Sequence, residues 1–485
     1  KVTIAWPSGL VQTVPAVPVN HRVWVREGSD DVRTEALLTK AAAPSGPGGS
    51  PVTDSSNRIA TGTWLYEPYP APDFTLSDLD GQERSLSGLA NRTALLLFWA
   101  SWAPPSREAL TELVTHRDAL AKAGVPALAL SVDSPEEVAK VREAASGAGI
   151  PVLIAGDAVA GTYTVLHRYL FDRREDLPLP IAFLVSAQGE IVKVYRDRIA
   201  AAQILEDAQR TDVSASERLK RAVPFAGTFY SNLGERSYFQ YGLELSEQGF
   251  DQPALAAFER VAAQDPSAIT FHNLGTLYMK GGRSADARAA FERALTLKPD
   301  YADASNSLGA LLAQSGEVPA AIERFRAALQ AKPDFPDAMN NLGFALFQTG
   351  DRARARELYE KALALQPGFP EALNNLGIFY GMQRDLDRAM TYFQQAVNGR
   401  PGYGEAANNL ALVLAARGET GKAIEVLQRL LQVNPAFETG YVTLCRLYLK
   451  GGQRQEGTQV LERLLQRNPT HPIGLQLLQG IRAGG

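Results

Sequence analysis

The sequence predicts a multidomain chain in which an α/β domain is followed by an all-α solenoid, with a short β-rich piece at the amino terminus. Residues 66–210 alternate short apolar runs with helical patterns, which is typical of a sheet covered by helices. Residues from about 235 onward repeat the same residue types at a fixed period. A segment rich in Pro, Gly and Ser at 41–53 has the composition of a linker and separates the amino-terminal piece from the rest.

Composition excludes several classes of protein and of site. The chain has 485 residues, of which 45% are apolar and 21% charged, an ordinary mixture for a globular protein. No run approaches the ~18 apolar residues of a membrane span, and a net charge of −4 does not favour nucleic acid. The five histidines lack the spacing of metal ligands, so neither a metal nor a cofactor is predicted. The single cysteine, Cys445, excludes a disulfide within the chain.

The amino-terminal 28 residues are predicted to form a two-stranded fragment. Trp6-Pro7-Ser8-Gly9 is flanked by β-rich runs, and a second such run ends at Glu27-Gly28. These motifs resemble the end of the ASPIC/UnbV domain. The resemblance implies that residues 1–28 are a carboxy-terminal piece of that domain, cut from a larger extracytoplasmic protein. Residues 29–65 are then expected to be a linker.

The domain predicted at 66–210 is built around a buried strand at 93–99. Further strands are expected at 126–132, 151–154, 181–185 and 191–195. Helices are expected at about 104–122, 134–146 and 158–171. Strands that alternate with helices in this way predict an α/β sheet with helices packed on it.

One motif in this domain carries a specific resemblance. Trp102-Ala103-Pro104-Pro105-Ser106 follows the first buried strand, and Pro180 directly precedes the strand at 181–185. These residues resemble the redoxin branch of the thioredoxin fold, the family of AhpC/TSA and TlpA-like thiol–disulfide proteins. The resemblance implies that the family's nucleophilic and resolving cysteines map onto Ala103 and Ser106, and that Pro180 is its cis-proline.

The same motif predicts that the redox chemistry is lost. Alanine has no group to ionise, and no histidine stands near Ser106 in sequence to activate its hydroxyl. We therefore expect a degenerate redox motif with no catalytic residue. The function that the resemblance still implies is binding of an extended peptide. The apolar surface for it would be formed by Trp102, Pro105, Leu179 and Pro180.

The carboxy-terminal half contains a repeat. Gly275, Gly309, Gly343 and Gly377 recur every 34 residues, and the register continues to Ala411 and Cys445. Each small residue is followed at fixed offsets by an alanine or glycine, a large apolar residue and a proline. This predicts two amphipathic helices per unit, with small residues where they cross and the large side chain directed toward the next unit.

The pattern resembles the tetratricopeptide repeat. The resemblance implies seven units at 235–469, preceded by a connector at 211–234 and followed by a capping helix at 470–485. Cys445 then lies at a small-residue position between packed helices, which predicts a buried and unreactive thiol.

Asparagines occur two positions before most of the small residues, on the helix that should line the concave face of a solenoid. An amide offers both a donor and an acceptor, so a ladder of amides can bond to the backbone of an extended peptide. The resemblance implies the same use. The predicted peptide-binding residues are Asn273, Asn341, Asn375 and Asn409. The alternative is that these amides tie helix ends to neighbouring turns.

The leading hypothesis is a non-enzymatic scaffold whose solenoid binds a partner protein or an extended peptide. The alternative is a thiol–disulfide oxidoreductase or peroxiredoxin relative that acts through a partner's cysteine. Self-association of the solenoid is a third hypothesis. The sequence does not fix the compartment, although both redoxin and ASPIC/UnbV resemblances imply a bacterial periplasmic or extracellular setting.

Overall fold

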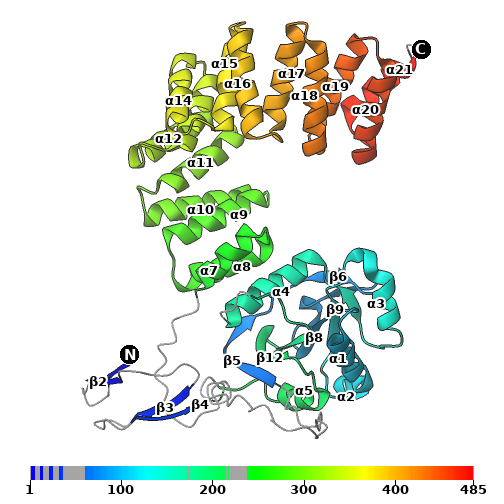
Figure 1. Ribbon diagram of the computed structural model, residues 1–485. Helices are drawn as coiled ribbons and strands as arrows, with labels where there is room; N and C mark the ends of the chain where they lie inside the picture. Colours follow the sequence, from blue (N-terminus) through cyan, green and yellow to red (C-terminus); the bar gives the residue numbers. More distant parts are fainter. Residues whose placement is uncertain are drawn as a thin grey trace, which may run out of the picture. The chain divides into compact units, whose positions relative to one another are not determined.

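The computed structural model describes residues 61–171, 175–214, 217 and 237–483, and the backbone of four strands nearer the amino terminus (Figure 1). The chain divides into two units, 1–59 and 60–485. In the first unit, β1 (Val2–Ala5) pairs with β2 (Val11–Val14), and β3 (His21–Val25) pairs with β4 (Val32–Ala36), both antiparallel. The sequence predicted two strands within residues 1–28, but three described strands, β1 to β3, lie there, and β3 pairs with β4 inside the predicted linker.

Several sequence predictions fall outside the described residues. These are the Trp6-Pro7-Ser8-Gly9 and Glu27-Gly28 motifs, the linker at 41–53 and most of the connector at 211–234. The ASPIC/UnbV resemblance therefore stays a prediction.

A six-stranded mixed sheet forms the centre of the α/β domain. Its strand order is β10-β9-β8-β11-β12-β5; β8, β9 and β10 run parallel, and β11, β12 and β5 pair antiparallel. Every residue of β8 is buried, as expected for a central strand covered on both faces. The strands are β5 (Thr61–Pro70), β8 (Ala94–Trp99), β9 (Ala127–Ser131), β10 (Val152–Ile154), β11 (Ile181–Val185) and β12 (Glu190–Arg196).

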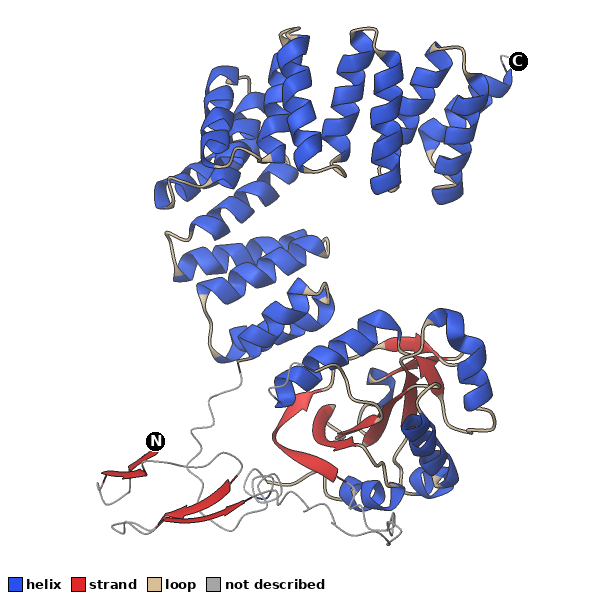
Figure 2. Cartoon of the chain, viewed as in Figure 1, coloured by secondary structure: helices blue, strands red, loops and turns tan. Residues whose placement is uncertain are grey.

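Helices cover both faces of this sheet (Figure 2). On one face Leu96 and Phe98 of β8 pack in the same core as Tyr163 of α4. On the other face Leu95 and Leu97 pack in a core with α1, α3 and α5. Alternate residues of one strand point to opposite faces, so β8 supplies both cores. The helices are α1 (Pro104–Thr115), α2 (Arg117–Lys122), α3 (Val138–Ala144), α4 (Gly156–Phe171) and α5 (Ala201–Ala208).

The sequence predicted the fold class correctly, but three features of this domain differ from the expected elements. The sheet begins with β5 at Thr61, inside the segment predicted as a linker. The helix expected at 104–122 is interrupted at His116 and forms α1 and α2. The hairpin of β6 (Thr75–Ser77) and β7 (Glu83–Ser85) and the helix α5 were not predicted. The two strands of the hairpin have three residues each and α5 has eight, which is too short for a clear apolar period.

The carboxy-terminal region is a run of helix pairs (Figure 1). Fourteen helices, α7 to α20, form seven pairs in the described part of the chain, and α21 follows them. No helix in the described part of the chain is long and apolar enough to cross a membrane.

The helices of this region are α7 (Tyr238–Glu247), α8 (Asp251–Gln264), α9 (Ala268–Lys280), α10 (Ser284–Leu297), α11 (Ala302–Gln314), α12 (Val318–Ala331), α13 (Pro336–Gln348), α14 (Arg352–Leu365), α15 (Pro370–Met382), α16 (Leu386–Gly399), α17 (Gly404–Ala416), α18 (Thr420–Val433), α19 (Glu438–Lys450), α20 (Arg454–Arg467) and α21 (Pro472–Ala483).

The small residues of the repeat mark close contacts between the two helices of one unit. A Cβ built on Gly377 of α15 would lie 2.5 Å from the ring of Phe393 on α16. Gly275, Gly309 and Gly343 meet Phe291, Phe325 and Tyr359 in the same way. The large side chain therefore packs on the glycine of its own unit. It also reaches the next unit as expected, since Phe291 shares a core with Leu308 and Leu312 of the following helix pair.

This contact predicts that Gly377→Ala destabilises the helical region. The added methyl group overlaps a fully buried ring, and overpacking of this kind typically costs about 1–3 kcal/mol. Gly421→Ala is the matched control, because no atom lies within 4 Å of its Cβ position in α18. Far-UV circular dichroism during urea unfolding measures both variants. Equal stability of the two would contradict the assigned packing.

Candidate functional site

The predicted redox motif lies in the loop between β8 and α1. Ala103 is the N-cap residue of α1, and Pro104 and Pro105 form the start of the helix. Trp102 is 66% exposed, whereas Ala103 and Ser106 are buried. Leu179-Pro180 is a cis peptide bond, as the resemblance implies. Since Ile181 lies opposite Phe98 in the sheet, continuing that register places Pro180 beside the start of the loop.

A buried carboxylate holds this loop in place. Asp133 accepts hydrogen bonds from the Ser101 backbone N–H at 2.9 Å and from the Ser101 hydroxyl at 2.6 Å. The Ser131 hydroxyl donates a third bond at 2.5 Å. Burial raises the pKa of Asp133, but these hydrogen bonds outweigh it and hold the pKa below its ordinary value. The carboxylate is therefore ionised at neutral pH and fixes the residues just before Trp102.

The two positions of the predicted redox motif, Ala103 and Ser106, carry no thiol. The Ser106 hydroxyl is buried without a hydrogen-bond partner among the described residues, so no base activates it. Cys445, the only cysteine, is fully buried in α19, and burial raises the pKa of its thiol to about 11. A thiol with that pKa is almost entirely protonated at neutral pH and is a poor nucleophile. No group of three or more His, Cys, Asp or Glu side chains within the described ranges could hold a metal.

The repeat asparagines form a ladder that runs from unit to unit. Asn341 donates to Asn306 at 3.0 Å, Asn375 to Asn340 at 2.8 Å and Asn409 to Asn374 at 3.0 Å. His272 and Ser307 take the same places one unit earlier, 3.1 Å apart. Burial lowers the pKa of His272, which favours its neutral form. Each bond joins the first helix of one unit to the first helix of the next.

The ladder leaves part of each amide free. Asn341, Asn375 and Asn409 are half-buried, and each uses one N–H in the ladder. The second N–H and the side-chain oxygen have no partner among the described residues, so they can meet a ligand. Asn273 is also half-buried but takes no part in these bonds. The preceding column lies deeper, since Asn340 and Asn374 are buried.

Sequence reasoning missed a second column on the same helices. Phe344 and Leu412, one position after the small residues, are 44% and 49% exposed. Ala310 and Ile378 occupy the same position in neighbouring units and are half-buried. The signal was available in the repeat register, but single apolar residues on helices are ordinarily assigned to the core.

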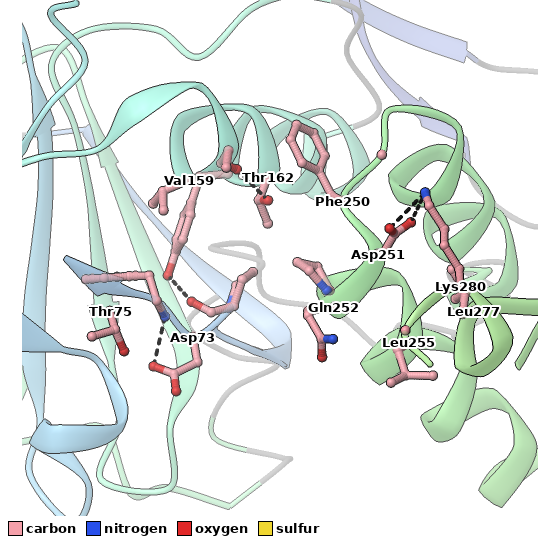
Figure 3. Close-up of a pocket in the computed structure, with 17 residues that line it drawn as sticks. Asp73, Thr75, Val159, Thr162, Phe250, Asp251, Gln252, Leu255, Leu277 and Lys280 are labelled. Atoms are coloured by element: carbon pink, nitrogen blue, oxygen red, sulfur yellow. Dashed lines mark hydrogen bonds and ion pairs between the residues drawn. The ribbon is translucent and has the colours of Figure 1, made fainter. Parts of the chain in front are cut away.

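A cavity of about 440 Å³ opens where the α/β domain meets the first helix pairs (Figure 3). Its polar wall groups bond to one another. Lys280 pairs with Asp251 at 2.8 Å, and the Tyr163 hydroxyl donates to the Pro72 carbonyl at 3.0 Å. Beside the cavity the ring of Phe250 lies on Gly161 of α4, so close that a Cβ there would be 2.3 Å away. This junction is a packing contact rather than a cluster of reactive groups.

Comparison with known proteins matches both halves of the chain. The model of the AhpC/TSA family matches residues 69–194. Models of the tetratricopeptide repeat match residues 272–336 and then 312–376, 346–411, 382–438 and 414–481. This chain joins an AhpC/TSA domain to tetratricopeptide repeats. The repeat models thus cover α9 to α21, whereas the first helix pair, α7 and α8, lies outside them. The AhpC/TSA model covers the sheet from the end of β5 to β12, including the Trp102–Ser106 loop.

Curated relatives match a part of this chain that is about as long as the AhpC/TSA domain. The thiol-disulfide oxidoreductase ResA of Bacillus subtilis (strain 168) is 26% identical over 130 residues, which are 27% of this chain and 67% of the relative. ResA of Geobacillus kaustophilus (strain HTA426) is 29% identical over 141 residues, 29% of this chain and 72% of the relative. ResA of Geobacillus thermodenitrificans (strain NG80-2) is 32% identical over 126 residues, 26% of this chain and 66% of the relative.

Solved structures resemble the tetratricopeptide region at low similarity. The Cut9–Hcn1 complex of the APC/C is 20% identical with a TM-score of 0.44, and the match covers 57% of this chain and 52% of that chain. MamA is 27% identical with a TM-score of 0.30, over 36% of this chain and 97% of MamA. YrrB, a TPR protein with an unusual peptide-binding site, is 23% identical with a TM-score of 0.30. The match covers 38% of this chain and 95% of YrrB.

Proposed function

We propose that this chain is a non-enzymatic scaffold whose tetratricopeptide region binds an extended segment of a partner protein along the first helices of its units. The observation that carries the proposal is the row of half-buried amides, each with a spare donor and acceptor, beside exposed apolar side chains. We call this surface of α11, α13, α15 and α17 the first-helix face.

The chemistry of the first-helix face suits a polypeptide backbone. An extended segment has unpaired N–H and C=O groups along its length, and Asn341, Asn375 and Asn409 offer complementary groups at regular intervals. Phe344 and Leu412 can bury apolar side chains of the same segment. Successive first helices contact one another directly, which is expected on the inner side of a superhelix.

The proposal assigns the AhpC/TSA domain a role without redox chemistry. Its support is that Ala103 and Ser106 carry no thiol and that the one cysteine of the chain is buried in a distant helix. The resemblance to ResA favours the competing function, thiol–disulfide exchange through a partner's cysteine. Trp102 is 66% exposed, so its ring is accessible to a bound segment in either case.

Removing the exposed apolar side chains of the first-helix face is expected to weaken peptide binding. A random dodecapeptide phage library is selected on the full chain, and synthetic copies of enriched peptides are measured by fluorescence anisotropy. We expect Phe344→Ser with Leu412→Ser to weaken binding at least tenfold, because each contact with a large apolar side chain is worth about 1.5–3 kcal/mol when fully buried.

The matched control replaces two exposed leucines on second helices, Leu297→Ser with Leu365→Ser, and is expected to leave the affinity unchanged. Equal losses in the two double variants, or no enriched peptide at all, would rule out the first-helix face as the binding surface.

A further inference from the structure

We infer that the first-helix face selects segments that combine basic with apolar side chains. This inference rests on the proposed function and names the chemistry of the partner. The supporting observation is that three kinds of side chain occupy the same three repeat positions on α11, α13, α15 and α17. Counted from the small residue of each unit, an acid lies six positions before, an amide or serine two before and an apolar side chain one after.

The three columns share one side of each helix. The offsets between them are four and three residues, and residues at those spacings are neighbours on a helix surface. In α13 they are Asp337, Asn341 and Phe344, and in α17 they are Glu405, Asn409 and Leu412. A segment that bonds to the amides therefore passes beside the acidic column and the apolar column.

The charge on this face has one sign. Each of the four helices carries a single charged residue, and it is acidic in every case. These residues are Asp303, Asp337, Glu371 and Glu405. The helix dipole explains why an acid is favourable in the first turn, but it does not explain why no lysine or arginine occurs anywhere else on these helices.

Three of the four acidic side chains have no ion-pair partner among the described residues. Glu371 pairs with Arg400 at 2.6 Å. No ion pair within the described ranges neutralises Asp303, Asp337 or Glu405, and Asp337 and Glu405 are exposed. Complementary charges across an interface favour the matching partner and penalise one of like charge. The apolar column supplies contact area, and the acidic column selects against acidic segments.

Three synthetic twelve-residue peptides test the inference on the full chain by fluorescence anisotropy. The first alternates leucine and lysine with glycine and serine spacers, which keep it extended. The second has glutamate for lysine, and the third has serine for leucine. We expect the first to bind at least tenfold more tightly than either of the others, and its affinity to fall as salt is raised from 0.05 to 0.5 M.

Neutralising the acidic column is the matched mutation. Asp303→Asn, Asp337→Asn and Glu405→Gln together are expected to weaken the lysine–leucine peptide about tenfold, since exposed charge pairs each contribute modestly. Glu357→Gln, Glu425→Gln and Glu462→Gln change the net charge equally on exposed positions of second helices and are expected to have no effect.

The outcomes separate this inference from the proposed function. If the Phe344/Leu412 variant loses peptide binding but the acidic triple variant does not, the face binds segments without regard to charge and the inference is wrong while the function stands. Equal binding of the lysine and glutamate peptides overturns it too. If sedimentation shows a dimer that the Phe344/Leu412 variant dissociates, the face is an interface between copies, and both proposals fail.

Discussion

Replacing Ala103 and Ser106 together by cysteine is expected to give the chain a redox-active disulfide and insulin-reductase activity. The two positions lie at the N-cap and in the first turn of α1, and the Ser106 N–H donates to the Ala103 carbonyl at 3.0 Å. That turn places the two side chains near one another, and the cis-proline side of the loop is already formed. Neither position carries a sulfur atom in the native chain.

The helix supplies what the introduced thiol needs. A cysteine at a helix N-terminus has its thiolate stabilised by the free backbone N–H groups and the helix dipole, which lowers its pKa below the ordinary value near 8.5. The Asp133 bonds to Ser101 hold the preceding residues in place, so the loop should tolerate the change. We expect the native chain to leave the dithiothreitol-dependent precipitation of insulin at its background rate, and Ala103→Cys/Ser106→Cys to raise it by at least an order of magnitude.

Two controls make this result informative. Ala103→Cys alone has no resolving thiol and is expected to form mixed disulfides without efficient turnover. Cys445 does not interfere, because its thiol is buried and its pKa is raised. Turnover by the native chain would contradict the proposed non-enzymatic function. A double variant that forms the disulfide but does not turn over would show that the domain has lost more than its cysteines.

The repeat region was the most predictable part of the molecule, because each unit solves the same packing problem. Gly377 must be small to admit Phe393, and that pair recurs in register, so sequence periodicity alone locates the helix pairs. The candidate site was predictable only in part. The two asparagine columns are visible in the sequence, but the bond from Asn375 to Asn340 spans 35 residues and joins different columns of adjacent units. Only the superhelical stacking brings them together.

One helix that the sequence did not predict, α5, carries a charged residue in unusual surroundings. Besides the apolar contacts of Ile204, α5 brings Asp207 to Lys193 of β12. A lysine and an aspartate in segments this short are ordinarily assigned to the surface. In the structure both are buried, with 5% and 3% of their surface exposed. Their burial follows from the contact between them, which no local pattern reveals.

Removing Asp207 is expected to destabilise the AhpC/TSA domain more than any other single substitution considered for it. The Lys193 ammonium lies 2.6 Å from the Asp207 carboxylate, and the Tyr195 hydroxyl donates to the same oxygen at 2.7 Å. Asp207→Ala leaves a buried ammonium without a counter-charge and a buried hydroxyl without an acceptor. Breaking a buried pair in this way typically costs about 3–5 kcal/mol.

The same helix offers the matched control. Glu206 pairs with Arg210 at 2.9 Å, but both side chains are about half exposed, so Glu206→Ala should cost less than about 1 kcal/mol. Tryptophan fluorescence during urea unfolding is the suitable measurement, because all the tryptophans precede residue 103 and the tetratricopeptide region contributes no signal. Three of the five tryptophans, Trp64, Trp99 and Trp102, belong to the sheet domain, so the signal follows this domain and not the solenoid. This matters in a chain whose parts need not unfold together.

The cost of Asp207→Ala should arise from the unpaired charge and not from loss of packing. Lys193→Met with Asp207→Leu removes both charges and fills the space with apolar atoms, and such replacements are often neutral or stabilising. We expect the double variant to recover most of the lost free energy of unfolding. The part that it does not recover is that of the Tyr195 hydroxyl, which still lacks its acceptor. If the double variant is as unstable as Asp207→Ala, the specific contacts of Lys193 and Asp207 stabilise the packing of α5, and the unpaired charge is not the cause of the loss. If Asp207→Ala is no less stable than Glu206→Ala, water reaches Lys193 and the pair is not buried in solution.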